Sequence, residues 1–148
     1  MGFLTFAHAG EEGPAEYVWD ALNNLSISRI DHGNRSLDDD QLIEELAKRK
    51  IPLTVCPLSN LKLKVVKELK NHPIRSMLLK GLLATVNSDD PAYFGGYLNE
   101  NYFAITDALN LTIDEINKLA QNSIEASFLI NGNKEKYISL LSSYTTNS

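Results

Sequence analysis

Gly2-Phe3-Leu4-Thr5-Phe6-Ala7 runs directly into His8-Ala9-Gly10-Glu11, and this junction of apolar and polar residues decides the fold. A short apolar run before a glycine predicts a strand over residues 3–8. His8 stands at the tip of this strand, and Glu11 follows three residues later across a glycine. The stretch therefore predicts a strand that delivers two functional groups to one pocket.

Three later stretches repeat this pattern. Asp31-His32-Gly33, Cys56-Pro57-Leu58-Ser59-Asn60 and Asn87-Ser88-Asp89-Asp90-Pro91 each close a short aliphatic or β-branched run. Leu82-Leu83-Ala84-Thr85-Val86 is apolar throughout, as expected of a parallel strand with both faces covered. Strands starting near residues 3, 27, 52 and 82 are spaced like the units of a (β/α)₈ barrel, of roughly 30 residues each. We therefore predict an α/β fold with four parallel strands and polar groups at their tips.

Helical periodicity fills the intervals between these strands. Pro14 suits the first turn of a helix, and Ser36-Leu37-Asp38-Asp39 has the pattern of a capping box before another. Beyond Pro91 the pattern is helical to the end. It predicts helices over residues 99–110, from a capping box at 111–116 through Leu129, and around 137–144, with Asn131-Gly132 as a stop signal between the last two.

Composition limits the function. The net charge of -5 and the pI near 5.1 argue against binding to nucleic acid, which depends largely on Lys and Arg. Cys56 is the lone cysteine and excludes an intramolecular disulfide, which fits a reducing compartment. No run approaches the roughly 18 apolar residues of a membrane helix. We expect a soluble cytoplasmic protein, or in a eukaryote also a nuclear one, that binds a small neutral molecule and not a membrane.

Together, the four motifs resemble the second half of the adenosine and adenine deaminases, a family of zinc-dependent (β/α)₈ barrels in the amidohydrolase superfamily. Leu61-Lys62-Leu63-Lys64-Val65-Val66, directly after the Cys56–Asn60 turn, is more similar to the adenine deaminase branch. The resemblance implies that residues 1–148 form a partial catalytic domain. It would contain the last four βα units of the barrel and the C-terminal helices, with the N-terminal half absent.

The resemblance implies roles at the metal and the attacking water. His8 matches a zinc-ligating histidine at the end of the fifth barrel strand, and Asp89 matches a zinc-ligating aspartate at the end of the eighth. His32 matches the histidine that orients and deprotonates the water that the zinc activates. Such a water has a pKa near 7 instead of 15.7, so it can attack C6 of a purine at neutral pH.

The same resemblance implies three contacts with the purine. Glu11 matches the carboxylate that protonates N1 while the ring is attacked, a role that needs a raised pKa. Asp90 matches the residue that hydrogen-bonds N7. Gly10 would let the backbone come close to the ring.

Some residues have simpler interpretations. A lone His8 or His32 is more often a structural histidine, and paired aspartates before proline are most often a turn or a helix cap. Their joint occurrence at strand tips favours the catalytic interpretation instead. His72 has no such context and is predicted to be structural. Cys56 lacks the Pro-Cys-x-x-Cys and His-x-Glu patterns of cytidine-type deaminases, so it is predicted to be a buried small residue.

The chain also departs from the family. Its histidines at positions 8, 32 and 72 form no His-x-His pair, so the site for one zinc ion is incomplete. A half-barrel exposes strand edges, and we expect an N-terminal half-barrel or a second chain to cover them. The chain is then a fragment or a truncated product with negligible turnover alone. Three functions stay open: part of an adenine deaminase, part of an adenosine deaminase, or an inactive remnant that acts as an interaction module.

Overall fold

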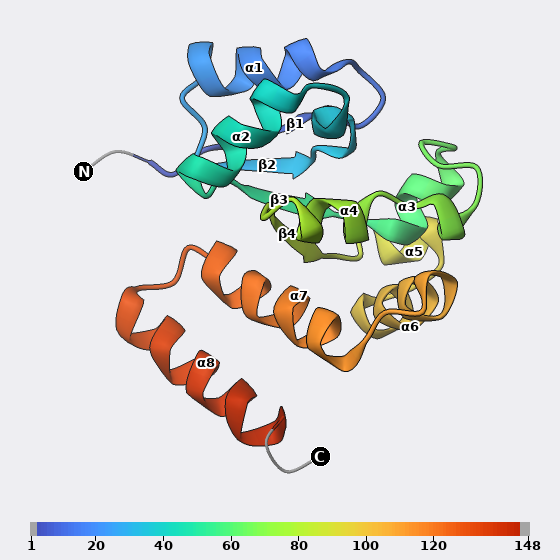
Figure 1. Cartoon of the computed structure of the whole chain (residues 1–148), viewed down its shortest axis with the longest axis vertical. Helices are drawn as coiled ribbons and strands as arrows, with labels where there is room; N and C mark the ends of the chain where they lie inside the picture. Colours follow the sequence, from blue (N-terminus) through green and yellow to red (C-terminus); the bar gives the residue numbers. More distant parts are fainter. Residues whose placement is uncertain (1–2, 146–148) are drawn as a thin grey trace.

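Four parallel strands form one sheet in a computed structural model that describes residues 3–145. Their order in the sheet is their order in the sequence, and each pairs with the next (Figure 1). Met1, Gly2 and the last three residues of the predicted 1–148 unit lie outside the described part. The strands are β1 (Phe6–Ala9), β2 (Arg29–His32), β3 (Pro52–Val55) and β4 (Leu83–Val86).

Helices cover the sheet and extend beyond it. In Figure 1, α1 and α2 lie above the β1–β2 end of the sheet, and α7 and α8 lie below β4. No helix within residues 3–145 has both the length and the apolar character needed to cross a bilayer. The α-helices are α1 (Ala15–Asn24), α2 (Asp40–Arg49), α3 (Pro57–Lys62), α4 (Ile74–Leu79), α5 (Pro91–Phe94), α6 (Leu98–Leu109), α7 (Ile113–Ala126) and α8 (Asn131–Thr145), and two 3₁₀ turns span Asn34–Asp38 and Leu69–Asn71.

The parallel α/β arrangement and the four strand positions are confirmed. The first strand begins later than predicted, at Phe6, because pairing with β2 starts at Arg29. Alternate strand residues such as Ile30 and Leu53 are fully buried against the helices. This alternation leaves the other face of the sheet to carry polar groups.

The start of α2 differs from the sequence prediction. Asp39, and not Ser36, caps α2, because residues 34–38 form a 3₁₀ turn first. The Asp39 side chain accepts hydrogen bonds from the N–H groups of Gln41 and Leu42. A hydrogen bond from the Trp19 indole at 2.8 Å is the largest cause of its lowered pKa.

The C-terminal helices meet at a different place from the one predicted. The Thr112–Glu115 capping box is confirmed at the start of α7. That helix ends at Ala126 because Ser127 turns to an extended conformation. Asn131 and Gly132 open α8 instead of separating two helices. A Cβ added at Gly132 would meet no heavy atom within 4 Å, so the lack of a side chain there leaves no packing defect.

His72, which was predicted to be structural, is buried and only 4% exposed. It lies between the second 3₁₀ turn and α4, where its Nδ1 accepts a hydrogen bond from the Ile74 N–H at 3.2 Å. Burial lowers the pKa of His72 from 6.5 to about 4. The folded chain therefore holds this imidazole neutral.

We expect His72 to make stability depend on pH. Between pH 6.5 and about 4, the unfolded state binds a proton at this imidazole that the folded state does not. The free energy of unfolding should therefore fall as pH falls through this window, by up to about 3 kcal/mol. His72→Gln cannot titrate, so urea unfolding between pH 7 and 4 should show a shallower loss in the variant. Parallel curves for both proteins would contradict the prediction.

Candidate active site

The strand ends bring polar side chains together on the face of the sheet that the helices leave open. The pairing register sets His8 beside Asp31, and Asp31 beside Thr54. The Thr54 hydroxyl donates to Asp31 at 2.6 Å. A cavity of about 270 Å³ opens here, lined by these three residues and also by His32 and Asp89. All four strand ends thus contribute to one polar cavity.

The two histidines of the predicted site are in contact. His32 Nε2 lies 3.1 Å from His8 Nδ1, a hydrogen-bonding distance. The His8 side chain is 64% exposed, whereas that of His32 is 2% exposed. His32 has a φ of 69°, so the backbone turns at the end of β2. Burial, followed by the neighbouring His8, lowers the pKa of His32, which favours its neutral form.

Glu11 completes this cluster. Its Oε1 lies 3.3 Å from His32 Nδ1. Burial is the largest cause of a raised Glu11 pKa, and the negative charge of Asp89 raises it further. The raised pKa expected of Glu11 is therefore found, and it increases the fraction of protonated carboxyl near neutral pH.

The paired aspartates point to different partners. Asp89 has a φ of 58°, and its Oδ2 accepts a hydrogen bond from the Ser59 hydroxyl at 2.7 Å. Asp90 caps α5 by accepting a hydrogen bond from the Tyr93 N–H at 3.1 Å. The turn at the end of β4 thus gives the two carboxylates different partners.

Gly10 has a packing reason to be glycine. Its φ is 65°, and an added Cβ would lie 2.6 Å from Val18 Cγ2. We expect Gly10→Ala to destabilise the chain by roughly 1–3 kcal/mol, because it adds left-handed strain and a clash in the core. Urea unfolding will measure the loss. Gly95→Ala is the matched control, since Gly95 has a similar φ but open space around it. An equal loss in both variants would contradict a packing role for Gly10.

The two predicted zinc ligands, His8 and Asp89, belong to two separate clusters of side chains, and both clusters contain His32. Within residues 3–145, His8, Glu11 and His32 form one cluster whose ligand atoms lie within 4.8 Å of one another, and His32, Cys56 and Asp89 form a second. Imidazole nitrogen and carboxylate oxygen are donors that Zn²⁺ accepts. The donor set therefore fits zinc, with His32 between the predicted ligands His8 and Asp89.

Cys56 is buried, as predicted, although its sulfur reaches the second cluster. Burial strongly raises the pKa of this thiol, and nearby carboxylates raise it further. In the metal-free chain this thiol is therefore protonated.

Sequence reasoning assigned no role to Ser59 and Asn60. Ser59 holds Asp89, while Asn60 Nδ2 lies 3.5 Å from Glu11 Oε1. Both side chains are fully buried. Their position in the sequence could have indicated a role, because they directly follow the end of β3 and the ends of the other three strands carry predicted site residues.

Comparisons with known proteins agree with this arrangement. An adenine deaminase from Crocosphaera subtropica is 58% identical over 135 residues, which cover 91% of this chain and 41% of that protein. The crystal structure of adenine deaminase from Arthrobacter aurescens has 43% identity and a TM-score of 0.95, covering 98% of this chain and 44% of that one. A zinc-bound amidohydrolase from Burkholderia ambifaria has 27% identity and a TM-score of 0.86, covering 99% of this chain and 43% of that one.

The chain spans about two fifths of the length of these relatives. Its four-stranded sheet is half of their (β/α)₈ barrel. The family model described as adenosine deaminase matches residues 1–144. On this match and these identities, the chain belongs to the adenosine deaminase family.

Proposed function

We propose that the chain supplies the acid, the base and part of the metal site of a hydrolytic deaminase that converts adenine and water to hypoxanthine and ammonia. The observation that carries this proposal is the contact of Glu11 and His32 at 3.3 Å, at the edge where all four strands end. The adenine deaminases among the relatives, at 52–58% identity, favour adenine over adenosine as the substrate.

Glu11 acts as the acid. Attack at C6 of a purine puts negative charge on the ring, and a proton delivered to N1 neutralises that charge. Burial raises the pKa of the Glu11 carboxyl, so it binds this proton more readily than an exposed glutamate does. Asp90 and Gly10 complete the purine contacts, at N7 and beside the ring.

His32 acts as the base. Its lowered pKa keeps the imidazole neutral at pH 7, so it can orient the attacking water and accept a proton from it. His32 Nδ1 lies 3.3 Å from Glu11 Oε1, so a proton that His32 accepts has only a short distance to travel to Glu11.

His8 and Asp89 are the chain's ligands for a single Zn²⁺ ion. When bound, zinc acts as a Lewis acid that makes water acidic enough to attack at neutral pH. Zinc sites in hydrolases use at least three protein ligands, so two from this chain leave the site incomplete. Residues 1–148 thus form a partial catalytic domain, and an N-terminal half-barrel or a second chain provides the other ligands.

Reconstitution tests this proposal. The chain is measured alone and after fusion to the part of the Crocosphaera subtropica relative that lies outside the match. Zinc content and the ultraviolet change from adenine to hypoxanthine are recorded, with adenosine in parallel. We expect about one zinc per fusion protein, conversion of adenine only, and negligible turnover by the chain alone. A folded fusion protein without zinc or turnover would instead support an inactive remnant, and conversion of adenosine would correct the substrate.

A further inference from the structure

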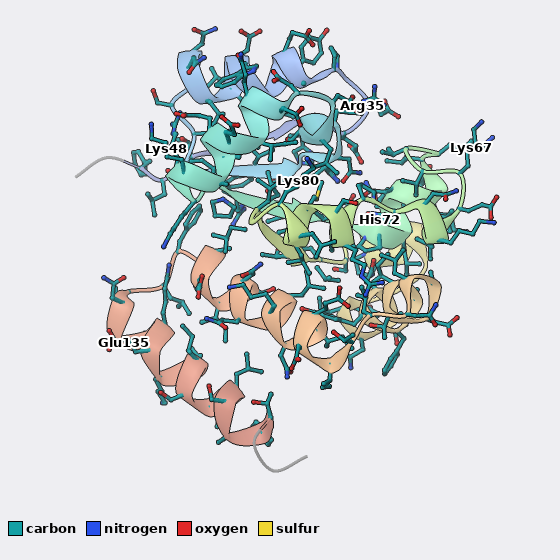
Figure 2. The ribbon with its side chains drawn as sticks, viewed as in Figure 1. Arg35, Lys48, Lys67, His72, Lys80 and Glu135 are labelled. Atoms are coloured by element: carbon teal, nitrogen blue, oxygen red, sulfur yellow. The ribbon has the colours of Figure 1, made fainter. Side chains whose placement is uncertain are left out.

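A line of hydrogen bonds runs from the start of α4 to the Glu11–His32 pair. It begins at the Ile74 N–H, which donates to His72 Nδ1 at 3.2 Å. His72 Nε2 lies 3.3 Å from Asn60 Oδ1. Asn60 Nδ2 lies 3.5 Å from both Glu11 Oε1 and His32 Nδ1. Figure 2 shows the labelled His72 among α3 and α4, whereas Lys67 and Glu135 lie at the periphery.

The backbone fixes the tautomer of His72. A backbone N–H can only donate, so Nδ1 must accept the hydrogen bond from Ile74 and carries no proton. The imidazole is 4% exposed, and among residues 3–145 its ring nitrogens bond to the Ile74 N–H and to Asn60, neither of which is charged. The neutral ring then carries its proton on Nε2 and donates it to Asn60.

The tautomer of His72 in turn fixes the amide of Asn60. An amide can rotate by 180° and exchange its oxygen and nitrogen. Because Oδ1 accepts from His72 Nε2, the Nδ2 group must face Glu11 and His32. Asn60 is fully buried, so no water competes for this orientation. The Nδ2 group thus donates to the Glu11 carboxyl and lies 3.5 Å from His32 Nδ1.

We propose that His72 is a positioning residue for deamination: through Asn60, it holds the Glu11 carboxyl and the His32 imidazole in the geometry that the reaction needs. This inference rests on the proposed function. His72 touches neither of these two groups itself and acts only through the amide. Reversal of that amide would aim an oxygen, in place of an N–H group, at the Glu11 carboxyl.

Two substitutions separate positioning from packing. His72→Asn keeps an acceptor near the position of Nδ1 for the Ile74 N–H but cannot reach Asn60. His72→Gln can place an N–H near the position of Nε2 and can still donate to Asn60. In the fusion protein, we expect His72→Asn to lower kcat roughly 10-fold with little change in KM. His72→Gln should have a kcat within about 3-fold of the wild-type value. We expect this difference in kcat between the two variants whichever of them is the more stable.

Ile74→Val is the control for lost stability. It removes a buried methyl group from the same turn and keeps the backbone N–H that His72 accepts. We expect a lower melting temperature and an unchanged kcat. A loss of kcat in this variant equal to that in His72→Asn would overturn the positioning role, because both losses would then reflect general destabilisation.

Nuclear magnetic resonance of the metal-free chain gives a readout independent of activity. In ¹⁵N-labelled protein at pH 7, we expect His72 to show the tautomer protonated at Nε2. The Asn60 side-chain amide should shift in His72→Asn and return toward its wild-type position in His72→Gln. A His72 ring protonated at Nδ1, or an Asn60 amide indifferent to both substitutions, would overturn the inference.

The outcomes separate this inference from the proposed function. An inactive wild-type fusion protein that binds zinc would refute the proposed function and, with it, the role of His72. An active wild type in which His72→Asn and His72→Gln have equal kcat values would overturn the role of His72 alone. Unequal values in the expected order, together with the amide shifts, would establish it.

Discussion

Glu11→Gln in the fusion protein should lower the deamination rate roughly 10³-fold while zinc content and purine binding persist. Glutamine fills the same space but has no acidic proton for N1, and general acid catalysis typically contributes between about 10² and 10⁴ in rate. Its amide can still contact His32, so the local fold should survive. Steady-state kinetics with adenine, together with binding of hypoxanthine, will separate the catalytic loss from a loss of affinity.

Glu12→Gln is the matched control for this prediction. Glu12 is the next residue in the same loop and is exposed, so its substitution removes a neighbouring carboxylate while Glu11 keeps its own carboxyl. We expect kcat within about 2-fold of the wild type, because exposed substitutions of this kind have small effects. An equally inactive Glu12→Gln variant, or a Glu11→Gln variant with near-normal kcat, would show that Glu11 is not the acid.

Asp89→Asn should weaken zinc binding by at least about 100-fold, because even residues that only support a ligand cost 10–100-fold in metal affinity when they are lost. Asparagine tolerates the left-handed backbone at this position, where φ is 58°. Its oxygen can still accept the Ser59 hydrogen bond. Zinc titration with a competing chelator will give the affinity, and unfolding curves will show whether the fold persists.

Asp90→Asn provides the comparison for zinc binding. Asparagine caps helices about as well as aspartate, so α5 should keep its first turn. We expect normal zinc affinity in this variant. If both variants lost zinc affinity equally, the net charge of the loop, and not ligation by Asp89, would determine zinc binding.

Local patterns were sufficient to predict the strands and most of the helices. The apolar run before Asn87 predicted β4, and the Thr112–Glu115 box predicted the start of α7. The prediction was wrong at the boundary between the last two helices. Asn131-Gly132 has the composition of a stop but opens α8, because the chain had already turned at Ser127.

The sequence predicted which polar groups lie at the strand ends but not which of them are in contact. Strand tips identify His8, Glu11, His32 and Asp89 because parallel strands end at the same edge of a sheet. No pattern predicts that Ser59 bonds Asp89, 30 residues away, or that Asn60 reaches Glu11, 49 residues away. His72 was predicted to be structural, and its contact with Asn60 was not predicted.

The sequence by itself determined the order of the elements and the chemical groups at each strand end, because alternation and turn residues act over a few neighbours. Tertiary structure alone decided which of those groups touch. The distances among Glu11, His32 and Asn60 depend on the register of separate strands and on the left-handed turn at His32. Those features arise only when helices pack the strands together, since the contacts join residues that are distant in the chain.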